Sequence, residues 1–127
     1  METGTHSLLI GVDHGQLVVN PAEILSAKAE GGYSRIRLMD GQEHLVCWHL
    51  GRLQAALAEH GFFRCHDSWV INLRRVVRLH NHDGHEAQLS DGSKARVSRR
   101  RFKELVDLLR GGVSRDDRVW RPSLCSE

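Results

Sequence analysis

Residues 62–72 read FFRCHDSWVIN and hold the clearest local pattern in this chain of 127 residues. Two apolar runs, 62–65 and 69–72, are joined by a polar connection, which predicts two neighbouring strands. Hydrogen-bonding side chains alternate with the apolar ones at Arg64, His66, Ser68 and Asn72. Because alternate residues of a strand share a face, these groups suit either a buried turn network or contacts to phosphates and base edges.

Short apolar runs separated by turn residues continue on both sides of this stretch. Asp-Gly pairs at 40–41, 83–84 and 91–92 lie between such runs, and His14-Gly15 is a weaker version. Asp-Gly suits tight hairpin turns because both residues tolerate a positive φ. The pattern therefore predicts a largely antiparallel protein. The expected strands cover residues 8–12, 17–19, 24–29, 33–39, 44–47, 62–65, 69–72, 76–80, 86–89 and 95–97.

Two segments have helical periodicity instead. Leu50, Leu53 and Leu57 form one apolar stripe with Gly61 just beyond, which predicts a short helix over residues 50–60 that ends at a glycine cap. After Ser98, apolar residues recur at 102, 105, 106 and 109, which predicts a second helix with Ser98 as its N-cap and its end near residues 111–112. The expected fold is therefore mainly β with two short α-helices.

Composition limits the classes of protein that fit. A length of 127 residues leaves room for one domain, which argues against a multidomain enzyme. With 40% apolar and 27% charged residues the chain can bury a core, so we do not expect wholesale disorder. No apolar run approaches the roughly 20 residues of a membrane span, and no signal peptide is evident. We therefore expect a cytoplasmic protein without membrane contact.

Positive charge gathers in one part of the chain. Residues 64–101 hold nine Lys and Arg against four Asp and Glu, whereas residues 1–63 hold four against seven. Arg99, Arg100 and Arg101 occupy the first turn of the predicted second helix, where unpaired N–H groups already make the field positive. Each is disfavoured there by about 0.3–1 kcal/mol. Either an external anion such as phosphate or an Asp or Glu from elsewhere in the fold is expected to neutralise them.

Three stretches together resemble the LytTR family of bacterial DNA-binding domains: residues 30–33 (EGGY), residues 62–72 and residues 97–99 (VSR). The middle stretch retains the pattern Phe-x-Arg-x-His-x-Ser-aromatic-x-x-Asn, and the other two lie at the expected distances from it. The resemblance covers about residues 8–110, which we expect to form the DNA-binding domain. Residues 1–7 would then be an N-terminal segment and residues 111–127 a flexible tail.

The resemblance implies an elongated arrangement of small antiparallel β-sheets that inserts loops, not a recognition helix, into successive major grooves of double-stranded promoter DNA. Family members regulate transcription, often as the output domain of a response regulator. They tend to bind direct repeats, so a second copy on the same DNA is expected, with no cofactor and no catalytic activity. Fewer than twenty residues precede the second expected strand, which indicates either a stand-alone regulator or an excised output domain.

By position, the resemblance assigns DNA contacts to three loops and to residues beside them. Arg99 or Arg100 either pairs with guanine O6 and N7 or holds a phosphate. The chain departs from many members at Gly32, where they have Asn, and at Asp67, where they have Arg or Asn. An aspartate repels phosphate unless it accepts from cytosine or pairs with an arginine such as Arg64. The residues expected to bind DNA are Gly32, Tyr33, Ser34, Arg64, His66, Asp67, Ser68, Asn72, Ser98, Arg99 and Arg100.

Other functions fit some of the same residues. A protein-interaction module would use the basic patch to bind an acidic partner, and a metal-responsive or redox-responsive regulator would use the histidines and cysteines. The histidine groups are His80, His82 and His85 around Asp83, and His44, Cys47 and His49. Zinc sites need four ligands, which neither group supplies alone, so no metal is expected.

The cysteines indicate structural rather than redox roles. Cys47, Cys65 and Cys125 are an odd number without close pairing, so a disulfide framework is not indicated. Cys65 beside His66 suggests a reactive thiol, but a small apolar strand residue whose neighbour points to the opposite face is the favoured interpretation.

Overall fold

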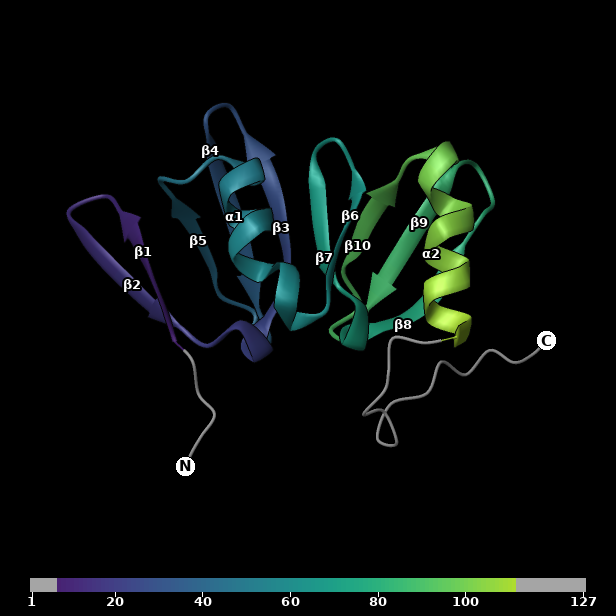
Figure 1. The fold of residues 1–127 in the computed structure, drawn as a ribbon, viewed down its shortest axis with the longest axis horizontal. Helices are drawn as coiled ribbons and strands as arrows, with labels where there is room; N and C mark the ends of the chain where they lie inside the picture. Colours follow the sequence, from purple (N-terminus) through teal and green to yellow (C-terminus); the bar gives the residue numbers. More distant parts are fainter. Residues whose placement is uncertain (1–6, 112–127) are drawn as a thin grey trace.

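The structure, a computed structural model, describes residues 7–111. In this range ten strands and two α-helices form two antiparallel sheets (Figure 1). The elements are β1 (Leu8–Val12), β2 (Gly15–Val19), β3 (Ile24–Glu30), β4 (Tyr33–Leu38), β5 (Glu43–Val46), α1 (Leu50–Leu57), β6 (Phe62–His66), β7 (Trp69–Asn72), β8 (Val76–His80), β9 (His85–Leu89), β10 (Lys94–Val97) and α2 (Arg99–Gly111). All the predicted strands and both helices are present. The proposed N-terminal segment, apart from Ser7, and the tail from 112 onward lie outside the described residues.

One sheet is larger than the small sheets we expected. It has the strand order β2-β1-β5-β4-β3-β7-β6, and the second sheet has the order β10-β9-β8. The larger sheet arises because β7 of the central hairpin pairs with β3, with Ala27 opposite Val70. At its other end, β1 meets β5 through the single residue pair Val12 and Val46. The strands follow one another along the long axis, which confirms the elongated, mainly β fold (Figure 1).

The predicted turn residues adopt the backbone conformation that their type allows. Asp83 and Gly84 both have positive φ, 65° and 102°, between β8 and β9. His14 also has a φ of 65° between β1 and β2. These left-handed conformations fit tight hairpins that follow the twist of the strands.

Helix α1 covers the larger sheet with its apolar stripe. Leu50, Leu53 and Leu57 are buried in one core cluster with residues of β1 to β5 and β7. The Nδ1 atom of His49 accepts from the main-chain N–H of Arg52 at 3.2 Å, which caps the helix. The last predicted turn is a 3-10 turn, η2 (Ala58–His60).

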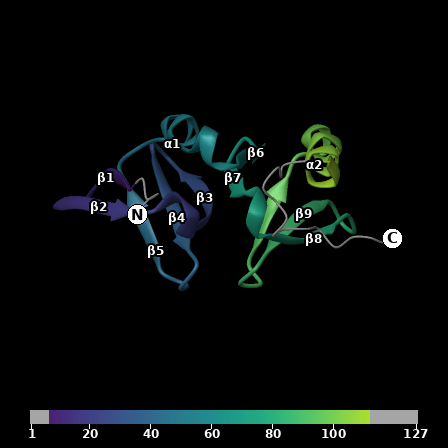
Figure 2. The ribbon, with the colours of Figure 1, turned by 60° about the horizontal axis from the view of Figure 1, so that its bottom comes forward.

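Helix α2 closes a second core over the smaller sheet. Leu105 and Leu109 are buried against strand residues that include Leu89 and Val97. Ser98 acts as the predicted N-cap, because its Oγ atom accepts from the main-chain N–H of Arg101 at 3.3 Å. Both helices lie on the same side of the sheets (Figure 2). No helix among residues 7–111 is long and apolar enough to span a membrane.

The connections between strands lie on two sides of the molecule, one at each end of the strands; we call these two sides edges. The β3–β4, β6–β7 and β10–α2 connections lie along one edge (Figure 1), which we call the loop edge. Main-chain hydrogen bonds hold these three connections beside one another: the N–H of Ala29 donates to the oxygen of Ser68 at 2.9 Å, and the N–H of Ser98 donates to the oxygen of Cys65 at 2.8 Å. The β4–β5 and β9–β10 turns lie at the opposite edge, together with η2 and the turns η1 (Pro21–Glu23) and η3 (Leu73–Arg75).

Candidate nucleic-acid interface

The β10–α2 connection presents two exposed arginines at the loop edge. Arg99 and Arg100 are exposed in the first turn of α2. Among residues 7–111, no carboxylate lies within ion-pairing distance of either guanidinium group. The alternative that the fold itself neutralises them is therefore not realised within the described part of the chain. Arg101 differs, because its Nη1 atom donates to the main-chain oxygen of Arg64 at 3.0 Å.

Arg64 is committed to holding the β6–β7 connection. Its guanidinium group donates to the main-chain oxygens of His66 at 3.1 Å and Asp67 at 2.6 Å, and to Oε1 of Gln54 in α1 at 2.8 Å. The arginine thus binds the main chain of Asp67 and forms no ion pair with its carboxylate, which stays exposed. Arg64 therefore positions the loop and α1 relative to each other.

His66 and Ser68 are tied into the same turn. The Nδ1 atom of His66 accepts from the main-chain N–H of Ser68 at 3.0 Å. In the neutral imidazole the proton then resides on Nε2, which makes that atom a hydrogen-bond donor. The turn consequently holds one donor of His66 in a fixed orientation beside the exposed Asp67.

The β3–β4 connection is divided between exposed and buried residues. Gly31 has a φ of 64°, Gly32 is exposed, and Tyr33 is 49% exposed. Ser34, which we expected to face DNA, is 0% exposed, and its Oγ atom donates to the main-chain oxygen of Trp48 at 2.8 Å. Ser34 therefore holds the β5–α1 connection against β4, and the DNA-facing role assigned to it is not supported.

Asn72 is also placed away from the loop edge. It is buried at the far end of β7, where its Nδ2 atom donates to the main-chain oxygen of Ile24 and its Oδ1 atom accepts from Arg74, both at 3.0 Å. The sequence left two roles open for the polar residues of 62–72, a buried turn network or contacts to DNA. Asn72 belongs to a buried turn network. It fixes the opposite edge instead of contacting a ligand at the loops.

The structure adds residues at the loop edge that we had not predicted. Val46 lies opposite Ser34, so the β5–α1 connection reaches the level of Tyr33. There the guanidinium carbon of Arg52 lies 4.1 Å from the centroid of the Trp48 ring, a cation–π contact. The pattern that identified α1 was its apolar stripe, and nothing in it indicated that the helix begins at this edge.

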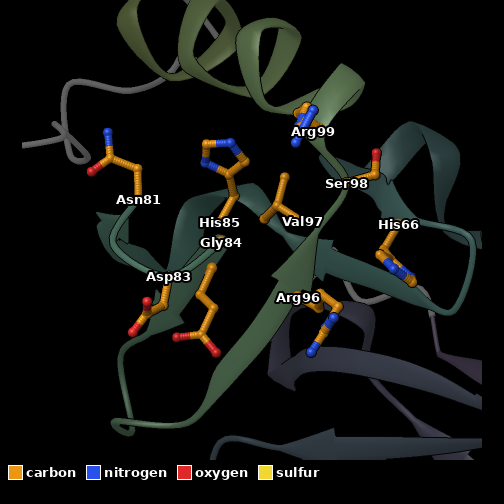
Figure 3. A pocket seen from close by; sticks show the side chains of 10 residues that line it. His66, Asn81, Asp83, Gly84, His85, Arg96, Val97, Ser98 and Arg99 are labelled. Atoms are coloured by element: carbon orange, nitrogen blue, oxygen red, sulfur yellow. The ribbon is translucent and has the colours of Figure 1, made fainter.

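A cleft of about 460 Å³ opens between the smaller sheet, the start of α2 and the end of β6 (Figure 3). His66 of the β6–β7 connection contributes one part of its lining. Ser98 and Arg99 contribute a second part, and the β8–β9 connection contributes a third. The cleft therefore joins two of the predicted DNA-facing loops to a connection that we had not assigned.

The structure disfavours thiol chemistry at Cys65. The side chain is 0% exposed, and its Sγ atom donates to the main-chain oxygen of Arg96 at 3.3 Å. Burial raises the pKa of the thiol to about 12, so it stays protonated at neutral pH. Cys47 is exposed, and Cys125 lies outside the described residues.

Two of the histidines considered as metal ligands have other contacts. The Nε2 atom of His80 lies 2.8 Å from Oε1 of Gln88, and the ring of His85 stacks on Phe102 with 4.1 Å between centroids. Within residues 7–111 no three His, Cys, Asp or Glu side chains gather as a metal site would require.

This architecture, two antiparallel sheets that present polar loops and exposed arginines along one edge, is that of a β-rich nucleic-acid-binding domain. The sequence profile of the LytTr DNA-binding domain matches residues 14–110, and the chain belongs to this family. The resemblance seen in the three sequence stretches is thereby confirmed.

Individual relatives support the same family. The sensory transduction protein LytT of Bacillus subtilis (strain 168) is 29% identical over 108 residues, which cover 84% of this chain and 44% of LytT. The chain thus spans less than half the length of that relative. A solved LytTr DNA-binding domain, from a protein of Bacillus cereus described as a methyl-accepting/DNA response regulator, has the same fold. It aligns with a TM-score of 0.66 and 17% identity over 81% of this chain and 98% of that domain.

Proposed function

We propose that this protein binds specific sequences of double-stranded DNA in the cytoplasm and regulates transcription, without catalytic activity of its own. In this proposal the loops of the loop edge enter successive major grooves. The observation that carries the proposal is the pair Arg99 and Arg100, which are exposed and have no carboxylate partner within residues 7–111. A DNA phosphate or base edge supplies the acceptor that these groups lack.

The proposed roles differ among the loop residues. Arg99 and Arg100 either pair with guanine O6 and N7 or bind phosphate. Asp67 is an acceptor only, so it suits the N4 amino group of cytosine and disfavours a phosphate. Tyr33 and Gly32 belong to the β3–β4 loop, which would enter a neighbouring groove. Arg52 adds a cation that would bind the backbone beside that loop.

Other residues named from the sequence support these contacts indirectly. Arg64 and Ser68 are bonded within the β6–β7 turn, and Ser98 caps α2. His66 retains one donor toward the cleft side of the turn. We assign them the role of orienting the loops, because a preorganised loop loses less conformational freedom on binding.

The relatives suggest the regulatory context. LytT is a sensory transduction protein, and the Bacillus cereus domain belongs to a protein described as a response regulator. We extend this role to the present chain as the DNA-binding output domain of a regulator. Binding to direct repeats would bring a second copy onto the same DNA.

Selection from random DNA duplexes tests the proposal and yields the target site. On a selected duplex, we expect Arg99→Ala or Arg100→Ala to weaken binding by about 1–3 kcal/mol if the residue reads a base. Arg110→Ala removes the same charge from the other end of α2 and is the matched control, with affinity close to that of the parent. For about four to six phosphate contacts, log K should fall against log salt with a slope of about −4 to −5.

The rival interpretation is a basic surface that binds an acidic protein. Poly-glutamate would then compete with the selected duplex, and Arg99 and Arg100 would contribute equally to both ligands. A chain from which no enriched DNA sequence can be selected, or a folded Arg99→Ala/Arg100→Ala double variant that binds duplex as tightly as the parent, contradicts the proposal.

A further inference from the structure

We propose that the β8–β9 connection, residues 81–84, is a fourth DNA-contacting loop, in which Asn81 and His82 donate hydrogen bonds to the sugar–phosphate backbone. This inference rests on the proposed function and extends its footprint beyond the three loops indicated by the sequence. It assigns a ligand to a segment that composition and turn chemistry identified only as a hairpin turn.

Strand register places this connection at the loop edge. In the smaller sheet, His80 lies opposite Glu86, and His85 lies opposite Val97, the last residue of β10. The connection therefore begins and ends at the level where β10 passes into Ser98. Because Ser98 donates to the main-chain oxygen of Cys65, that level is shared with the β6–β7 turn.

The cleft described above brings the connection against the proposed interface. Asn81, Asp83 and Gly84 line it together with His66 and Arg99 (Figure 3). The β8–β9 connection therefore lies within the reach of a DNA strand that contacts Arg99 and the β6–β7 turn.

The base of the connection is fixed on both strands. His80 is hydrogen-bonded to Gln88, with 2.8 Å between Nε2 and Oε1, and the ring of His85 stacks on Phe102 with 4.1 Å between centroids. The Nδ1 atom of His85 is buried without a hydrogen-bond partner among the described residues. The loop is thus held in one place relative to α2, which is the element that carries Arg99.

The side chains of the loop suit a nucleic-acid backbone. Asn81 and His82 are exposed and have no hydrogen-bond partner within residues 7–111. Amide and imidazole N–H groups commonly donate to phosphate oxygens. The exposed carboxylate of Asp83 opposes this contact, because it repels phosphate. If this loop faces DNA, removal of the Asn81 and His82 side chains lowers the affinity for DNA, and removal of the Asp83 charge raises it.

This opposition of sign defines the experiment, which measures the affinity of the full chain for a duplex selected with the parent protein. Asp83→Asn keeps a residue that tolerates the positive φ of this position, and we expect it to tighten binding about two- to five-fold. Asn81→Ala/His82→Ala should weaken binding at least about five-fold. It should also remove hydroxyl-radical protection at one end of the footprint.

Matched controls lie at the opposite edge. Glu59→Gln makes the same charge change as Asp83→Asn on an exposed residue of η2, and Ser90→Ala truncates an exposed, uncharged residue of the β9–β10 turn. Both should bind within two-fold of the parent, about the change expected from surface charges alone.

The outcomes separate the two proposals. If the parent binds its selected duplex and the Asp83 and Asn81/His82 variants match it in affinity and footprint, the fourth loop is refuted and the proposed function stands. Equal tightening by Asp83→Asn and Glu59→Gln also refutes it, because the effect then reflects net charge alone. If the parent selects no duplex, both proposals fall.

Discussion

Both edges of the sheets bond polar side chains within the fold, but the loop edge also presents exposed polar groups that have no such bonds. At the opposite edge they are bonded to each other: Arg37 binds both Asp91 and Glu43, and Asn72 joins the main chain of Ile24. At the loop edge Arg35 binds Glu30 in a similar ion pair, whereas the most exposed polar groups have no such partners among residues 7–111. These groups are Asp67, Asn81, His82, Arg99 and Arg100.

The difference shows which edge has hydrogen-bonding and charged groups available to bind a ligand. Buried or half-buried polar groups bond within the fold because an unsatisfied group is costly. At the loop edge Arg64, Ser34 and Arg101 meet this requirement one layer below the surface, whereas Nδ1 of His85 does not. The exposed layer above them is thereby oriented but remains unbonded. The comparison predicts that stability and DNA affinity respond to different residues.

The largest effect on stability at the loop edge should come from Arg64→Ala. Removal of the guanidinium group leaves the carbonyls of His66 and Asp67 without their donor, and we expect the free energy of unfolding to fall by about 2–3 kcal/mol. Urea unfolding measures this change. Arg64→Lys should recover little of it, because an ammonium group cannot replace the three-pronged contact. Arg99→Ala should not lower the free energy of unfolding, because a cation at the start of a helix is unfavourable. An Arg64→Ala variant as stable as the parent would break the distinction between the two layers.

Asn72→Ala is the corresponding test at the opposite edge. It removes the donor to Ile24 and the acceptor from Arg74, so unfolding free energy should fall by about 1–2 kcal/mol. Affinity for a selected duplex should stay at the parent value when measured well below the melting temperature. Loss of DNA binding by a folded Asn72→Ala variant would return this residue to the interface.

The ion pair between Arg37 and Asp91 predicts a dependence of stability on pH. Burial favours a higher pKa for Asp91, but hydrogen bonds from Ser93 and Arg37 outweigh it and lower the pKa from 3.8 to about 2. A carboxylate with a lowered folded-state pKa stabilises the fold above its unfolded pKa, and this stabilisation is lost as the pH falls from about 4 to about 2. Asp91→Asn should therefore cost about 1 kcal/mol near neutral pH. In urea unfolding at decreasing pH, the parent and the variant should converge. A constant difference across that range would exclude this cause.

The smallest expected effect is that of Arg52→Ala. Arg52 is exposed and rests on Trp48, so its loss should change stability by no more than about 0.5 kcal/mol. If it binds a phosphate, the slope of log K against log salt should become less negative by about 0.9. Titration of the selected duplex at several salt concentrations measures the slope, with Arg78→Ala, an exposed residue of β8, as the control. An unchanged slope would remove Arg52 from the interface.

The secondary structure was predictable because its causes are local. Apolar alternation, Asp-Gly turns and the leucine stripe of α1 each act within about ten residues. The strand order was not predictable in this way, since the pairing of β3 with β7 depends on contacts more than forty residues apart in sequence. The position of the β5–α1 connection, and with it Arg52, at the loop edge follows instead from the pairing of β5 with β4, in which Val46 lies opposite Ser34.

For the interface, the family pattern identified the loops but not which of their side chains are buried and which are exposed. Ser34 precedes the buried Ile36 by two residues, so strand alternation already indicated that it points inward. Arg101 was grouped with Arg99 and Arg100 because the three are adjacent in sequence. Only the folded position of Arg64 shows that the third arginine turns inward.

Two hydrogen bonds join the β6–β7 and β10–α2 connections, so that their positions are coupled. One runs from Arg101 to the main-chain oxygen of Arg64, and the other runs from the main-chain N–H of Ser98 to the oxygen of Cys65. A substitution that shifts either connection displaces the other. Base preferences contributed by Asp67 and by Arg99 should consequently show epistasis instead of adding independently. Relatives that change target sequence at one of these connections are therefore expected to have acquired compensating changes at the other.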